Sequence, residues 1–323
     1  MFNIYMKYTL VLFLSLLSLQ ISAQETQNPE AVLVTPEQKT EFLRIHKGSN
    51  GVASALQLAN ARYIKNHDAA NNVSVDLISA VHIADKSYYE NLNELFKTYD
   101  VVLYELVAPE GTRVGGNVGD KSKGDKNTGG KNISLMTSLQ RGMQNVLGLT
   151  FQLDEVDYSA SNFVHADISP TDFKRSMAEK GESFLSMFLK LWLVGMQQQA
   201  ANKSAATDAQ LLLALFSPTR ERDLKVIVAQ QFIQMRPTID ALEGENGSTI
   251  ITTRNLKALQ VLRQEIKKGH KKLAIFYGAA HMPGIEEGLI EEFGMQLDQI
   301  NWVDGWDLRV PVMAPKTAVE NAP

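Results

Sequence analysis

Apolar runs alternate with helical patterns along much of the chain. A β-rich run over 73–82 precedes apolar residues at helical spacing up to Phe96, and a second apolar run covers 101–107. Ser87 and Glu90 have the spacing of a capping box at the start of this helix. A strand, a helix and a strand within about 35 residues predict a βαβ unit, in which the two strands are parallel.

The same order of elements recurs near the C-terminus. An apolar stripe at helical spacing ends at Gly269, and a strand is predicted over 272–277. Pro283 suits the first turn of a following helix, which ends before Gly294. The pattern predicts an α/β fold with a mixed or mostly parallel central sheet flanked by helices.

Other elements are predicted from shorter patterns. A helix is expected over 40–65, and a short strand over 163–167 leads into a helix capped by Ser169 with Pro170 in its first turn. Residues 181–243 read as mostly helical, which predicts a helical insertion or lid in the middle of the chain. Within it, an apolar segment is too short to cross a bilayer.

Two ends and one loop are separated from the main domain. Residues 1–23 read as a secretory signal peptide, because their apolar core is shorter than the ~20 residues of a membrane span. An uncleaved anchor is the alternative. Residues 24–40 form a flexible leader, 41–308 the α/β domain and 309–323 a tail, while the glycine-rich stretch 110–131 is a mobile loop. We therefore expect a periplasmic or secreted protein with no stable membrane span after cleavage.

Composition narrows the chemistry. The net charge of −4 and the lack of a basic patch argue against a nucleic-acid partner. The absence of cysteine excludes disulfides, thiolate nucleophiles and thiolate metal ligands. Signatures of zincin proteases, serine hydrolases, P-loop NTPases and Rossmann oxidoreductases are missing. Any metal site must therefore use His, Asp or Glu, and the oligomeric state is left open.

Two turns match each other. Ser79-Ala-Val-His82 and Gly278-Ala-Ala-His281 each follow a buried strand, begin with small residues and end in histidine shortly before a helix. In open α/β sheets, ligands collect beyond the carboxyl ends of the strands. The two histidines would meet there if their strands are neighbours. The alternative for each histidine alone is a structural role, as a hydrogen-bonded residue at a strand end.

Glu105 is the third candidate, because it lies late in the apolar run 101–107. A carboxylate in such surroundings is costly to bury unless it is paired or binds a cation. Two imidazoles and one carboxylate make a three-ligand metal site with an open position, which is suited to activating water. Nitrogen and oxygen donors leave Zn, Mn, Co and Fe open. The alternative is a Glu105 that pairs with an arginine.

These blocks resemble the TraB/PrgY/GumN family, which includes the Tiki proteases. The family carries two Gly-x-x-His motifs and a glutamate after the first one. The second motif is intact at Gly278 to His281, Glu105 falls where the family's glutamate falls, and Ser79 stands where glycine is expected. The resemblance covers roughly residues 45–305. It implies a fold similar to the erythromycin esterase and ChaN proteins, built from two related halves that meet at one site.

The resemblance also implies an activity. Tiki-like members are metal-dependent peptidases, with Mn or Co favoured, whereas ChaN-like relatives are associated with haem. Arg254, in a sequence similar to the family's Arg-Asn pair, is expected to bind a substrate carboxylate or an oxyanion; a surface or salt-bridge residue is the alternative. Residues 147–170 are similar to a stretch of exported members, in which Asp167 is a candidate site carboxylate and His165 is structural.

Two functions from different classes follow. The first is an exported metal-dependent hydrolase that acts on a peptide or another small molecule, with Mn, Co or Zn held by His82, His281 and Glu105. Glu105 and Arg254 are its candidate catalytic residues. The second is a non-catalytic protein that sequesters a peptide or haem in the same cleft. A member of the family without chemistry is a third possibility.

Overall fold

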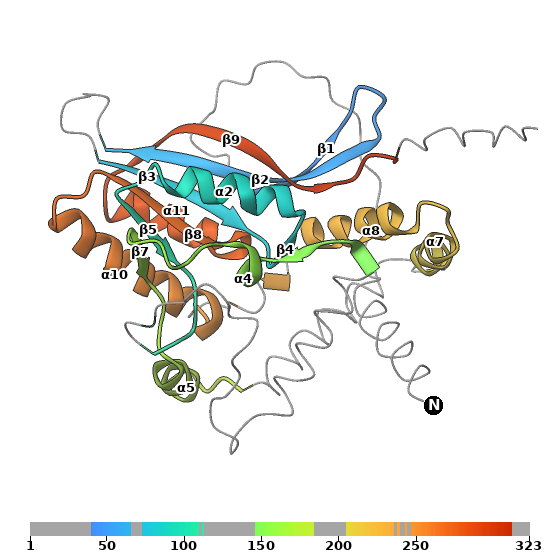
Figure 1. Ribbon diagram of the computed structural model, residues 1–323. Coiled ribbons are helices and arrows are strands. Elements are labelled where there is room, and N and C mark those ends of the chain that lie inside the picture. The colour runs from blue at the N-terminus through green and yellow to red at the C-terminus, as the bar shows by residue number, and fades with distance from the viewer. Residues whose placement is uncertain are drawn as a thin grey trace, which may run out of the picture.

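The computed structural model describes residues 40–65, 73–109, 112, 146–183, 205–235, 238–239, 243 and 247–311 (Figure 1). The predicted signal peptide, nearly all of the predicted leader and glycine-rich loop, and the tail beyond 311 lie outside these residues, as does the apolar segment 184–196 within the predicted insertion. In the described part of the chain, no helix is long and apolar enough to cross a membrane.

A seven-stranded mixed sheet forms the centre of the protein, in the order β1-β2-β3-β8-β5-β7, with β9 paired to β2. The strands are β1 (Leu43–Lys47), β2 (Ala53–Ile64), β3 (Ser74–Ala80), β5 (Val101–Tyr104), β7 (Phe163–His165), β8 (Lys272–Gly278) and β9 (Gln296–Asp307). The pairs β3–β8, β8–β5 and β5–β7 are parallel. The pairs of β2 with β1, β3 and β9 are antiparallel.

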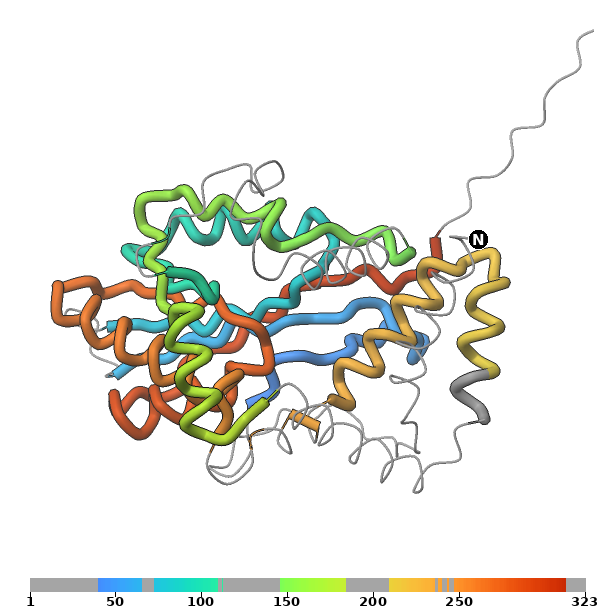
Figure 2. Tube along the Cα trace, turned by 90° about the horizontal axis from the view of Figure 1, so that it is seen from below, coloured from blue at the N-terminus to red at the C-terminus, as the bar shows by residue number. Residues whose placement is uncertain are grey.

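Helices cover both faces of this sheet, which Figure 2 shows as three layers. One core packs α2 (Lys86–Phe96) and α8 (Arg220–Gln234) on one face, and a second core packs α10 (Arg254–Lys267) and α11 (Met282–Glu291) on the other. The smaller elements are β4 (Ile83–Ala84), β6 (Thr150–Phe151), α4 (Gln152–Glu155), α5 (Pro170–Glu179), α7 (Ala205–Leu215), the π-helix η2 (Thr249–Thr253) and the 3-10 helix η3 (Ala279–His281). The predicted α/β fold with a mixed sheet and flanking helices is confirmed.

Several local predictions are confirmed because short-range chemistry decides them. Ser169 caps α5 by accepting a hydrogen bond from the amide of Asp172, and Pro170 occupies the first turn. Gly269 follows α10 and Gly294 follows α11, each with a positive φ that glycine adopts without strain. Helical segments α7 and α8 also lie within the predicted insertion.

The predicted helix over 40–65 is wrong, because this segment forms β1 and β2. Its alanine, leucine and arginine content favours helix locally. However, Leu56 and Leu58 are buried in one core, whereas Ala59 and Tyr63 are buried in the other. Pairing of β2 with three strands and burial on both faces therefore override the local preference.

The predicted capping box is also wrong. Helix α2 begins at Lys86, and its N-cap is Asp85, whose side chain makes no capping hydrogen bond. The Asp85 carboxylate instead binds Lys225 at 3.1 Å and also accepts a hydrogen bond from the amide of Asp307. The Asp85 side chain thus binds residues that are distant in the sequence and does not cap the helix.

Candidate functional site

Four parallel strands end at one edge of the sheet, and each is followed by a residue that the sequence singled out. In the register of β3, β8 and β5, Ala80 pairs with Gly278 and Tyr104 pairs with Phe276. His82 follows β3, His281 follows β8, Glu105 follows β5, and Asp167 follows β7. These residues are distant in the sequence and come together because β8 lies between β3 and β5. In open α/β sheets, ligands bind at this edge, beyond the carboxyl ends of the strands.

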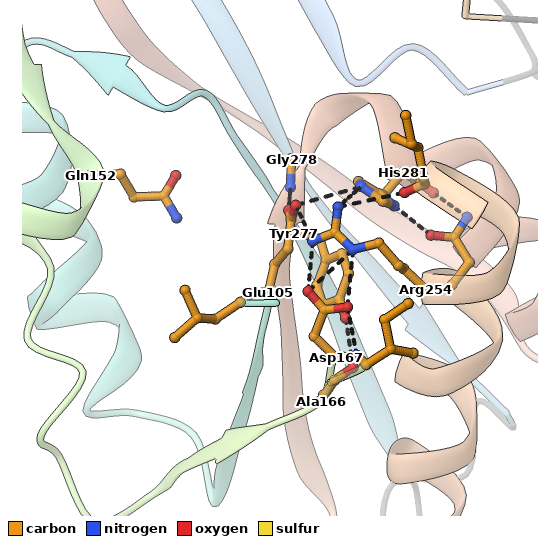
Figure 3. A network of polar contacts seen from close by, with 12 residues as sticks. Glu105, Gln152, Ala166, Asp167, Arg254, Tyr277, Gly278 and His281 are labelled. Atoms are coloured by element: carbon orange, nitrogen blue, oxygen red, sulfur yellow. Dashed lines mark hydrogen bonds and ion pairs between the residues drawn. The ribbon is translucent and has the colours of Figure 1, made fainter. Parts of the chain in front are cut away.

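Glu105 is held in its ionised form. Its Oε2 accepts a hydrogen bond from the amide of Gly278 at 2.7 Å, and its Oε1 accepts one from Arg254 Nη2 at 2.7 Å (Figure 3). Burial by itself raises the pKa of this carboxyl. Attraction to the protonated form of His281 and to Arg254, together with the Gly278 amide, outweighs burial and lowers the pKa to about 2. The residue is therefore an anion at neutral pH.

His281 is buried and has one defined tautomer. The amide nitrogen of Asn255 donates to the His281 carbonyl at 3.2 Å, so its amide oxygen faces His281 Nδ1, at 2.7 Å. Nδ1 therefore carries the proton and Nε2 presents a lone pair. Nε2 lies 3.6 Å from Glu105 Oε1 and 3.4 Å from Arg254 Nη1. Burial lowers the pKa of the imidazole to about 4, against the opposing effect of the Glu105 charge, so it is neutral at pH 7.

Arg254, in the first turn of α10, links the other members of the cluster. Its Nε and Nη2 donate to Asp167, whose side chain is fully buried, and Nη2 also donates to Glu105. The Nη1 contacts are longer, at 3.5 Å to the carbonyl of Ile250 and 3.4 Å to His281. Two carboxylates thus share one guanidinium. The π-helix η2 precedes this residue, and short π-helical segments are frequent at functional sites.

The residues of the matched first turn lie differently. His82 is exposed, although its charge contributes to the lowered pKa of Glu105. Ser79, at the position of the expected glycine, is buried, and its hydroxyl has no partner. In the described part of the chain, no group of three or more His, Asp or Glu side chains is arranged to hold a metal ion. The structure therefore brings His281, Glu105, Asp167 and Arg254 together, with His82 outside their hydrogen-bonded network.

Further residues of the site were not assigned a role from the sequence. Asn255 fixes the His281 tautomer, and the Tyr277 hydroxyl donates to the carbonyl of Ala166 at 2.6 Å, beside Asp167. Their only signal was position, since one follows Arg254 and the other precedes Gly278. The Nε2 of His165 lies 2.6 Å from the Leu106 carbonyl, a backbone contact that fits the structural role expected for this residue.

A cavity of about 900 Å³ lies elsewhere, at the start of α8 and the end of β9, and none of its lining residues belongs to this cluster. Comparisons with protein-family models, curated proteins and solved structures find no match. The TraB/PrgY/GumN resemblance therefore stays a prediction, and the site is interpreted from its own geometry. That geometry consists of a buried imidazole, two carboxylates and one arginine at the carboxyl edge of the parallel strands.

Proposed function

We propose that this protein is an exported, metal-dependent hydrolase that acts on peptides at the carboxyl edge of its sheet. One observation carries the proposal: Glu105 Oε1 lies 3.6 Å from His281 Nε2, and both atoms are unprotonated at neutral pH. With pKa values of about 2 and about 4, both groups are weak bases. This favours a role as ligands over a role as general bases.

The two donors fit one divalent cation. Ligand bonds to Zn²⁺ from imidazole nitrogen and carboxylate oxygen are about 2.0–2.2 Å, so atoms 3.6 Å apart can both reach one ion. Metal ligands must also be deprotonated, and a ligating histidine usually donates its other ring N–H to a fixed acceptor. The Asn255 amide oxygen supplies that acceptor. Mn, Co and Zn all accept this donor set.

His82 is the proposed third ligand, since it follows the neighbouring strand β3 and acts electrostatically on Glu105. When bound, a divalent cation supplies a Lewis acid and makes water a stronger acid. The chain itself supplies orientation: Arg254 and the Gly278 amide hold both oxygens of Glu105. The long contacts of Arg254 Nη1 mark the end of the guanidinium that a substrate carbonyl can approach.

Metal content and peptide cleavage test the proposal together. The mature protein is purified, its metals are measured by mass spectrometry, and digestion of casein is followed with added Mn²⁺, Co²⁺ or Zn²⁺. His281→Ala is compared with His270→Ala, whose histidine is 37% exposed beside Glu265 at the other end of β8. We expect wild type and His270→Ala to bind metal and cleave casein, and His281→Ala to lose both.

Three results separate the alternatives. Equal casein cleavage by wild type and His281→Ala contradicts the catalytic role of this site. Metal binding without cleavage favours the non-catalytic protein that sequesters a peptide. A Soret band on titration with haem supports the haem version of that alternative. For His82→Ala we expect metal binding to weaken by more than the about 10- to 100-fold that loss of a residue orienting a ligand costs, with an unchanged melting temperature of the metal-free protein because the side chain is exposed.

A further inference from the structure

Gln152 has a buried polar atom that none of the residues described by the structure binds. It is the first residue of α4, and its backbone amide donates to the carbonyl of His82 at 3.0 Å. The side chain is 6% exposed, and its Nε2 donates to the Tyr158 hydroxyl at 2.8 Å. Its Oε1 is buried without a hydrogen-bond partner. Such an atom lowers stability, so its presence requires an explanation.

The unpaired end does not depend on how the amide is oriented. If the amide is turned over, its oxygen accepts from Tyr158 and its nitrogen is left unpaired instead. The orientation observed places the donor on Tyr158 and leaves the acceptor free. The bond to Tyr158 also fixes the side chain in place. The free oxygen is therefore a preorganised acceptor.

Gln152 is linked to the strand ends that carry the proposed catalytic residues. Its backbone binds His82 at the end of β3, and Tyr158 packs on Tyr104, the residue before Glu105, with ring centroids 5.2 Å apart. Figure 3 shows the Gln152 amide on the side of Glu105 opposite to Arg254, pointing toward the Glu105–Gly278 pair. The charge of Glu105 also reaches Tyr158, where it helps burial to raise the pKa of the phenol.

We propose that Gln152 is a substrate-binding residue, whose Oε1 accepts a hydrogen bond from a backbone N–H of a bound peptide and so makes the site select amides over esters. The inference rests on the proposed function, because it places the substrate between Gln152 and the Glu105–Arg254 pair. A peptide group has a carbonyl acceptor and an N–H donor on opposite sides. Arg254 offers a donor for a substrate carbonyl, and Gln152 offers an acceptor for a substrate N–H.

The chemistry excludes an ester at the same place. Replacing N–H by an ester oxygen removes the donor and sets two lone pairs against each other, so that the buried acceptor stays unpaired. A site built to hydrogen-bond a substrate N–H discriminates strongly against an analogue that lacks it. Ser79, which also has a buried hydroxyl without a partner, is less informative because its hydroxyl hydrogen rotates freely.

A lactate scan tests the inference by binding. Dansyl-labelled penta-alanine is compared with four counterparts, in each of which lactate replaces one alanine at positions 2 to 5, so that one N–H becomes an ester oxygen. Kd is measured by fluorescence polarisation with the metal-loaded full-length mature protein. For wild type we expect one counterpart to bind about tenfold more weakly than penta-alanine, as expected for one lost buried hydrogen bond.

Three variants give the scan its meaning. Gln152→Met keeps the size of the side chain and removes the acceptor, so we expect the sensitivity to that lactate to disappear. Gln152→Glu keeps an acceptor, so we expect this variant to show the same sensitivity to that lactate as wild type. Gln234→Met is the matched control, because Gln234 also has a buried oxygen without a partner but ends α8, and it should behave as wild type. Circular dichroism confirms that each variant is folded.

The outcomes separate this inference from the proposed function. Equal lactate sensitivity in wild type and Gln152→Met, or no sensitivity at any position in wild type, overturns the inference while casein cleavage still judges the hydrolase. Gln152-dependent binding without cleavage of any peptide supports the inference and overturns the hydrolase. Absence of both binding and cleavage by wild type overturns both.

Discussion

Acidification should destabilise the metal-free protein through His281 before most carboxylates titrate. Burial lowers the pKa of this imidazole from 6.5 to about 4. Because the folded-state pKa is depressed, the unfolded chain takes up a proton first as the pH falls. The stability contributed by neutral His281 is therefore fully present above pH 6.5 and is lost as the pH falls toward 4. At about 1.4 kcal/mol per pH unit, lowering the pH from 7.5 to 4.5 removes about 2 to 3 kcal/mol.

Urea denaturation measures this loss directly. Chelator-treated wild type, His281→Gln and His270→Gln are unfolded at pH 7.5 and at pH 4.5, and the free energy of unfolding is extrapolated to water. Other titrating groups affect all three proteins alike. We expect His270→Gln to follow wild type, and His281→Gln to lose about 2 to 3 kcal/mol less between the two pH values. An equal loss in wild type and His281→Gln would refute the reasoning, because His281 would then not be held neutral by the fold.

Three further predictions concern the neighbours of His281. Arg254→Met should lower the free energy of unfolding by about 3–5 kcal/mol, since it leaves two buried carboxylates unpaired; Arg263→Met, which breaks an exposed pair at 2.6 Å, should cost less than about 1 kcal/mol in the same urea titration. Gly284→Ala should lower kcat for casein by at least about tenfold, because its Cβ would lie 2.6 Å from Asn255 Nδ2 and displace the amide that orients His281; unchanged kcat contradicts the role of that amide. Asn255→Leu should mix the two tautomers of His281, which the ¹⁵N chemical shifts of its ring report, whereas wild type should show the proton on Nδ1 alone.

The sequence predicted the strand ends and thereby most of the site. A buried strand followed by small residues and histidine is a local signal, and parallel strands bring such signals to one edge. His281 Nε2 and Glu105 Oε1 lie 3.6 Å apart, whereas His82, the third predicted ligand, lies outside their hydrogen-bonded network. The sequence could not show that Arg254 lies between Glu105 and Asp167, because that arrangement depends on how α10 packs on the sheet.

The errors share a physical cause, which is long-range pairing. The segment 40–65 has the composition of a helix, but strand β9, from the other end of the chain, pairs along β2. The exposure of His82 likewise depends on the chain around it: the short pair β4–β6 and helix α4 hold its backbone and leave the imidazole in solvent. Repetition of a motif therefore predicted where both histidines lie, but not how each side chain is turned.

The position of β8 governs when this fold can be completed. It lies between β3 and β5, strands that precede it by about 170 to 190 residues, so the central parallel sheet lacks a strand until residues 272–278 have been made. Folding rates fall as contacts span longer stretches of chain. A polypeptide truncated before His281 therefore lacks the assembled centre.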